Sequence, residues 1–162
     1  MKILCIAIGS RGDIEPFIAK AEIFQNKGHQ VICAFPEQFR SITEQANLRF
    51  HSLGSEFLEM MHSPEGKIVL GGGGSGLKKI IATIKLNSKF GEISKALMKN
   101  QFELYETEKP DRVIHHGKAI YGYIWGAQNP EKTFISTPIP LLYHPVKGKT
   151  HLVFNSNYGR FL

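Results

Sequence analysis

The sequence is short of cysteine. Its 162 residues include only two, Cys5 and Cys33, and both lie within apolar segments. Two such cysteines do not make a disulfide framework, so the chain has to fold by burying a hydrophobic core. A reducing cytoplasm is therefore the expected compartment.

Long apolar runs are also missing. No stretch approaches the ~20 apolar residues that cross a bilayer, and residues 1–8 resemble the start of a strand rather than a signal peptide. We expect a cytoplasmic protein whose contact with a membrane is at most peripheral, at the inner membrane surface.

The common phosphate-binding signatures are absent from the first strand-to-helix connection. Gly9 and Gly12 do not supply the G-x-G-x-x-G spacing of dinucleotide-binding proteins, and no Gly-Lys-Ser or Gly-Lys-Thr closes this turn. These absences argue against a Rossmann dehydrogenase and against an ATPase. The glycine run at residues 71–74 follows no strand, and we interpret it as a hinge or loop.

Metal-ligand patterns are equally sparse. His115 and His116 are adjacent, so their side chains should point to opposite faces of an extended strand, and no third ligand has suitable spacing. We expect no metal and no cofactor.

The composition is that of one globular domain, with 42% hydrophobic and 21% charged residues. The formal net charge of +6 favours anionic partners. The densest group of lysines, within residues 78–99, follows a helical spacing, which indicates a solvated helix face rather than a nucleic-acid groove. No nucleic-acid partner is expected.

Apolar strand patterns alternate with helical ones along the chain. Strands are predicted at residues 2–8, 30–35, 48–52, 112–115 and 133–136, and helices at residues 14–28, 37–46, 77–107 (with a possible break near Gly91) and 118–127. This order predicts an α/β, Rossmann-like, doubly wound parallel sheet. Residues 54–76 break the pattern and are expected to form a mobile excursion. The tail at residues 137–162 has no clear element and is expected to lead to a further domain.

The connection at residues 9–16 reads Gly-Ser-Arg-Gly-Asp-Ile-Glu-Pro. It should lie beyond the carboxyl end of the first strand, where open α/β sheets bind ligands. Two glycines permit a tight turn, and the side chains of Ser10 and Arg11 add donors near the positive end of a helix. The pattern favours a loop that faces phosphate.

This motif resembles the start of family 28 and family 1 glycosyltransferases, above all the sterol and antibiotic glycosyltransferases. The resemblance extends, in the right order, to residues 27–31, 36–40, 109–116 and 136–140. It implies one half of a GT-B fold, in which this first domain holds the acceptor and a second domain holds the nucleotide sugar. The donor signature of the second domain has no counterpart here, so we expect that the chain alone is inactive and that a carboxyl-terminal donor-binding domain works with it in cis.

The implied reaction transfers a hexosyl group, with inversion, from a nucleotide-diphosphate sugar, expected to be a UDP-sugar, to a hydroxyl of a lipophilic acceptor. The resemblance assigns the catalytic base to Asp13, although an aspartate at this position also caps a helix. It places Ser10, Arg11 and Gly12 beside the donor phosphates, with ordinary turn residues as the alternative. Glu15 is interpreted as an acid of the first helical turn.

The acceptor-binding residues are expected to follow the fourth and fifth strands: His115, His116, Lys118, Thr137 and Pro138. Apolar side chains of the 54–76 excursion, Met60, Met61 and Leu70, can line the same side or fill the core. Two other functions stay open. One is a binding subunit of a split glycosyltransferase without activity of its own; the other is a flavodoxin-like or regulator domain, which the first loop disfavours because it lacks a phosphoacceptor constellation.

Overall fold

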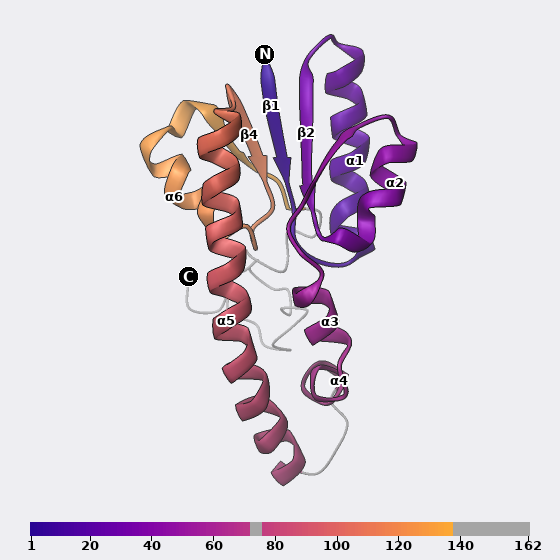
Figure 1. Ribbon diagram of the computed structural model, residues 1–162, viewed down its shortest axis with the longest axis vertical. Coiled ribbons are helices and arrows are strands. Elements are labelled where there is room, and N and C mark those ends of the chain that lie inside the picture. The colour runs from indigo at the N-terminus through magenta and orange to yellow at the C-terminus, as the bar shows by residue number, and fades with distance from the viewer. Residues whose placement is uncertain (72–75, 138–162) are drawn as a thin grey trace, which may run out of the picture.

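The computed structural model describes residues 1–71 and 76–137 and contains one parallel sheet of five strands in the order β3-β2-β1-β4-β5 (Figure 1). The strands are β1 (Lys2–Ile6), β2 (Gln30–Phe35), β3 (Arg49–Ser52), β4 (Arg112–His115) and β5 (Thr133–Ile135). The α-helices are α1 (Arg11–Asn26), α2 (Arg40–Gln45), α3 (Glu56–His62), α4 (Pro64–Gly71), α5 (Gly76–Glu108) and α6 (Ile120–Gln128), with short 3-10 turns at Glu37–Phe39 and Pro130–Lys132. The predicted doubly wound α/β fold is confirmed.

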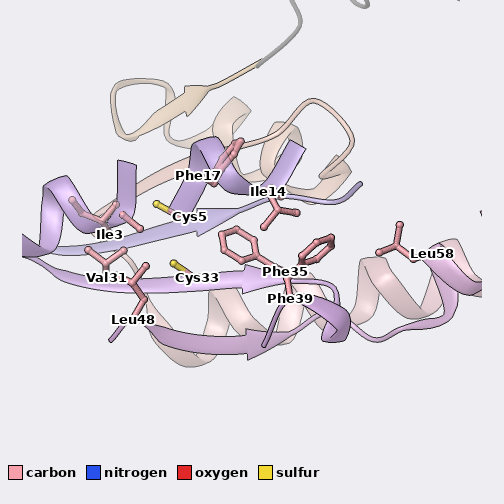
Figure 2. Close-up of a cluster of buried hydrophobic side chains, with 12 residues drawn as sticks. Ile3, Cys5, Ile14, Phe17, Val31, Cys33, Phe35, Phe39, Leu48 and Leu58 are labelled. Atoms are coloured by element: carbon pink, nitrogen blue, oxygen red, sulfur yellow. The ribbon is translucent and has the colours of Figure 1, made fainter. Parts of the chain in front are cut away.

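Both faces of the sheet are buried, and the alternation of side chains along β1 shows it. Ile3, Cys5 and Ala7 join a cluster with residues of α1 and of the segment that leads into α2, whereas Leu4 and Ile6 join a cluster with residues of α5. Figure 2 shows the first cluster, and Figure 1 shows α1 and α2 on one side of the strands with α5 and α6 on the other. Burial on both faces explains why the central strands β1 and β2 are almost continuously apolar in sequence.

The chain changes direction across the sheet at β1. From β1 it moves to β2 and β3 on one side, and after α5 it returns to β4 on the other side of β1. Cys5 consequently has Cys33 of β2 as one neighbour in the ladders and Ile114 of β4 as the other. Such a switch point leaves a crevice beyond the carboxyl ends of the two central strands, and ligands of α/β proteins bind there.

Residues 54–76, expected to form a mobile excursion, contain two helices where the structure describes them. Pro64 begins α4, where its missing amide hydrogen costs nothing. A Cβ at Gly66 would lie 2.4 Å from the carbonyl oxygen of Met61 and 2.5 Å from that of Met60, so this glycine lets α4 pack closely on α3. The glycine run itself lies outside the described residues apart from Gly71, which ends α4.

The long helix α5 is continuous through Gly91, so the break considered there does not occur. Its 33 residues give a length of about 50 Å, far more than the strands it covers. Its amino-terminal half therefore extends past the carboxyl ends of the strands and runs beside α3 and α4 (Figure 1). The helices α3 and α4 and this half of α5 pack together beyond the carboxyl ends of the strands.

Candidate functional site

The site begins with the loop after β1. Gly9 has a φ of +147°, and a Cβ at this position would lie 2.2 Å from Oδ2 of Asp13. Glycine is therefore required here for two reasons: the backbone conformation is one that other residues rarely adopt, and the carboxylate of Asp13 occupies the space of a side chain.

Asp13 closes the first turn of α1. Its Oδ2 accepts hydrogen bonds from the backbone amide of Ser10 at 2.8 Å and from the Ser10 hydroxyl at 3.1 Å. Ser10 is the N-cap residue, so Asp13 stabilises the start of the helix, as the capping interpretation of the sequence predicts. The other contacts of the carboxylate come from a distant part of the chain.

His116 reaches Asp13 from the end of β4. Its Nε2 lies 3.3 Å from Oδ1 of Asp13, and its Nδ1 accepts the backbone amide of Lys118 at 3.4 Å. Because Nδ1 accepts a hydrogen bond, the ring proton of a neutral His116 belongs on Nε2, from which it is donated to the carboxylate. The backbone amide of His116 donates to the carbonyl of Ile6 at 2.8 Å, and its ring packs edge-on against Phe17.

Lys118 completes the cluster. Its Nζ donates to Oδ2 of Asp13 at 3.3 Å, while its side chain is 39% exposed and that of Asp13 only 8%. Residues 105 positions apart in the sequence thus meet at the switch point, because the loops after the neighbouring strands β1 and β4 leave the sheet at the same edge.

These contacts determine the charge of the carboxylate. Burial alone would raise the pKa of Asp13, but the hydrogen bond from His116, the positive charge of Lys118 and the amide of Ser10 together hold it well below its usual range. Asp13 is therefore ionised at neutral pH.

An apolar pocket of about 310 Å³ adjoins this cluster. Its lining comes from the ends of β1 and β4 and from α3, α5 and α6: Ile8, Phe57, Phe90, Ser94, Leu97, Met98, Gln101, Gly117, Lys118 and Ile120. Lys118 belongs to both the pocket and the ion pair with Asp13, so the pocket lies next to the carboxylate.

Of the other predicted site residues, Ser10 joins this cluster through its two hydrogen bonds to Asp13, while Arg11 and Gly12 face solvent. Arg11 is exposed and pairs with Glu15, with Nε and Oε1 2.6 Å apart. Gly12 faces open space, and Ser10 is exposed beside it. Thr137 is half-buried, and Pro138 lies outside the described residues.

His115 points away from Asp13, to the face of the sheet that α6 covers. A Cβ at Gly122 would lie 2.5 Å from its ring, and the ring of Tyr123 packs edge-on against it. Burial lowers the pKa of His115. His115 thus belongs to the packing between β4 and α6, and only His116 joins the site.

Sequence reasoning missed the pocket wall on α5. Phe90, Ser94, Leu97 and Gln101 are spaced by four, three and four residues, which places them on one face of a helix. This spacing is visible in the sequence, but nothing in it shows what the face covers. Met60, for which the acceptor side and the core were both open, is buried and does not line this pocket.

Two features are absent from the part of the chain that the structure describes. Within residues 1–71 and 76–137, no group of three His, Cys, Asp or Glu side chains is placed to hold a metal ion. Over the same part of the chain, no helix is both long and apolar enough to span a membrane.

Known proteins are similar to this chain in sequence and in fold. O-mycaminosyltylonolide 6-deoxyallosyltransferase of Streptomyces fradiae is 27% identical over 120 residues, which are 74% of this chain and 25% of that protein. A sterol 3-beta-glucosyltransferase of Arabidopsis thaliana is 38% identical over 60 residues, which are 37% of this chain and 10% of that protein. Among solved structures, the calicheamicin glycosyltransferase CalG4 gives a TM-score of 0.60 at 15% identity, covering 83% of this chain and 31% of that one.

The chain spans a quarter or less of the length of these two relatives. The structural similarity shows the Rossmann-like fold that GT-B glycosyltransferases share. The family model of the glycosyltransferase family 28 N-terminal domain matches residues 3–130, which is most of the sequence. The chain therefore belongs to the family of glycosyltransferase family 28 N-terminal domains.

Proposed function

We propose that this chain is the acceptor-binding half of a glycosyltransferase that moves a hexosyl group from a nucleotide-diphosphate sugar to a hydroxyl of a lipophilic acceptor, with inversion. The observation that carries this proposal is the ionised Asp13 at the switch point, next to an apolar pocket and joined to it by Lys118. The pocket matches a lipophilic acceptor, and the names of the sterol glucosyltransferase relatives agree with one.

In this mechanism Asp13 is the base. The oxygen of the acceptor hydroxyl attacks the anomeric carbon, the bond from that carbon to the diphosphate breaks, and the hydroxyl proton moves to the Asp13 carboxylate. A single displacement of this kind inverts the anomeric centre. The nucleoside diphosphate leaves with the electron pair of the broken bond.

Lys118 and His116 prepare the carboxylate for this role. With Lys118 on Oδ2, Asp13 is ionised but a weak base, since its pKa is low. An acceptor hydroxyl that displaces the Nζ of Lys118 removes that charge from Oδ2 and so raises the proton affinity of the carboxylate. His116 keeps Oδ1 in place throughout, because its ring is buried.

The donor is assigned to the exposed side of the same loop. Ser10, Arg11 and Gly12 surround the amino terminus of α1, where free amides and the helix dipole favour phosphate. The open space beside Gly12 leaves room for the backbone to approach a diphosphate. The proposed donor is a UDP-sugar, bound chiefly by a carboxyl-terminal domain in cis, with no metal or cofactor.

The alternative is a binding subunit of a split glycosyltransferase, inactive by itself. The exposed side chains of Phe90 and Ile120 at the pocket suit a second domain of the same chain or a separate one. The intact mass of the protein in its source cell separates the two: roughly twice 18.2 kDa or more indicates a domain in cis, and a mass near 18.2 kDa indicates a separate partner.

The proposed location is the cytoplasm, with peripheral contact at the inner membrane surface. Cys5 and Cys33 are buried as free thiols, and burial raises the pKa of Cys5 to about 12, which suits a reducing compartment. The first nine residues of α5 include four exposed large apolar residues beside the lysines of this helix: Leu77, Ile80, Ile81 and Ile84. Co-sedimentation with vesicles rich in anionic lipid tests this contact; equal recovery with neutral vesicles would contradict the charge argument.

The central test is Asp13→Asn in the complete native protein. Removing a base of this kind should lower kcat by about a hundredfold or more. Glu15→Gln, in the same helical turn but paired with Arg11 at the surface, is the control and should leave kcat unchanged. Near-normal turnover in Asp13→Asn would rule out the base and leave Asp13 as a helix cap.

A second measurement separates the acceptor side from the donor side. The double variant His116→Ala and Lys118→Ala should raise the KM of the acceptor more than that of the nucleotide sugar. The opposite order would place both residues with the donor.

A further inference from the structure

The apolar pocket contains one polar group that the rest of the protein does not explain. Gln101, on α5, is only 2% exposed, yet it lines the pocket. Its Oε1 has no hydrogen-bond partner within the part of the chain that the structure describes. Buried side-chain oxygens in proteins nearly always accept a hydrogen bond, so the unpaired Oε1 of Gln101 needs an explanation.

No side chain of the core donates to Oε1 of Gln101, and the buried hydroxyl of Tyr105, one turn further along α5, also has no partner among the described residues. One turn away on the same helix face are Leu97 and Leu104, both packed with the apolar cluster between α5 and the sheet. Leu97 also lines the pocket, as does Phe57 of α3, and neither can donate a hydrogen bond. An amide in this position weakens the core unless something that enters the pocket bonds to it.

Besides Ser94, the apolar lining of the pocket contains two polar side chains. One is Lys118, whose Nζ contacts the carboxylate of Asp13, at the loop after β4. The other is Gln101, which comes from α5 and so belongs to a different wall.

We propose that Gln101 selects acceptors that carry a second hydroxyl, by accepting a hydrogen bond from that hydroxyl while the reacting one lies at Asp13. This inference rests on the proposed function and adds a substrate class to it: a lipophilic diol or polyol rather than a lipid with a single hydroxyl. A mono-hydroxylated molecule of the same shape leaves Oε1 of Gln101 without a donor, so it gains no hydrogen bond there and binds less tightly.

Two steroids of the same shape test the proposal on the complete native protein: androstanol, with one hydroxyl, and androstanediol, with a second hydroxyl at the opposite end of its rings. We expect androstanediol to bind more tightly by calorimetry, and to have the higher kcat/KM, by on the order of tenfold. In Gln101→Leu this preference should disappear through a higher KM for the diol, with kcat little changed.

Ser94→Ala is the matched control, because Ser94 is the other uncharged polar side chain that α5 contributes to the pocket. It should keep the preference for the diol; loss of the preference in Ser94→Ala instead of Gln101→Leu would overturn the assignment. Gln101→Met is a second variant that should lose the same preference, and it is included in case leucine packs badly at this position.

The melting temperature of the unliganded variants provides a readout besides activity. Because Oε1 gives up no bond within the described residues, Gln101→Leu or Gln101→Met should melt no lower than the unmodified protein. If both variants melt lower, Gln101 has a structural role and the proposal is wrong. Equal binding of the two steroids would also refute the role of Gln101, but the pocket would remain the proposed acceptor site. If neither steroid binds, the assignment of the pocket to the acceptor is wrong as well.

Discussion

Replacing Gly9 and Gly12, one at a time, by alanine should change stability in opposite directions. The two glycines lie three residues apart in one loop and receive the same added methyl group. The structure assigns them different surroundings. A Cβ on Gly9 would lie 2.2 Å from Oδ2 and 2.7 Å from Cγ of Asp13, at a φ of +147°, whereas a Cβ on Gly12 would meet no atom within 4 Å.

The expected cost at Gly9 has two parts. Forcing alanine into such a backbone conformation costs about 1–3 kcal/mol. Moving the Asp13 carboxylate away from the Ser10 amide, from His116 or from Lys118 costs about a further 1–3 kcal/mol, because at least one charge-assisted hydrogen bond is lost. Gly9→Ala should therefore lower the free energy of unfolding by about 2–6 kcal/mol.

Gly12 lies inside the first turn of α1, where alanine is the better helix former. Gly12→Ala should raise the free energy of unfolding by about 0.4–1 kcal/mol, mainly by restricting the unfolded chain. Urea denaturation followed by circular dichroism at neutral pH measures both changes. Two shifts of the same sign, or an unchanged midpoint for Gly9→Ala, would refute the placement of Asp13 against Gly9.

Three further predictions concern charge and burial. Asp13→Asn should destabilise the chain by about 2–4 kcal/mol and Glu15→Gln by less than about 0.5 kcal/mol. Because the folded pKa of Asp13 is lowered, its stabilisation is fully present above the unfolded value of about 4, so the difference between these variants should shrink as urea titrations are repeated at lower pH. Lys118→Met removes a positive charge that lowers the pKa of Asp13. The acidic side of the pH profile of kcat/KM in the complete protein should therefore move to higher pH. If the acidic side of the profile does not move, another group titrates there. Cys5 and Cys33 should react with a thiol reagent only after unfolding, since both are buried with raised pKa values, and rapid labelling of the native protein would contradict that burial.

The central strands were predictable because they have to be apolar on both faces. The ranges 30–35 and 112–115 agree with β2 and β4 residue for residue, since a short apolar run between turn residues has few other uses in an α/β chain. The helices of residues 54–71 were not predictable in the same way. Gly66 resembles a loop residue in the sequence, but its role is to allow close packing between α3 and α4, which only the packed helices show.

The two histidines show the same limit at the site. The sequence placed His115 and His116 at the end of one strand and predicted opposite directions for their side chains. It did not say which of them meets Asp13, because this depends on which face α1 covers and which face α6 covers.

By itself, the sequence determined the alternating order of elements, the parallel sheet, the family and the importance of the loop at residues 9–16, because these follow from local periodicity and from one contiguous motif. Only the tertiary structure decided that Asp13 is bonded to both His116 and Lys118 and that a face of α5 with the buried Gln101 forms a pocket beside them. The physical reason is that these contacts join loops more than a hundred residues apart. The distances between these loops depend on how β1 and β4 pair and on how α5 packs across them. Neither the pairing nor the packing can be predicted from a short stretch of sequence.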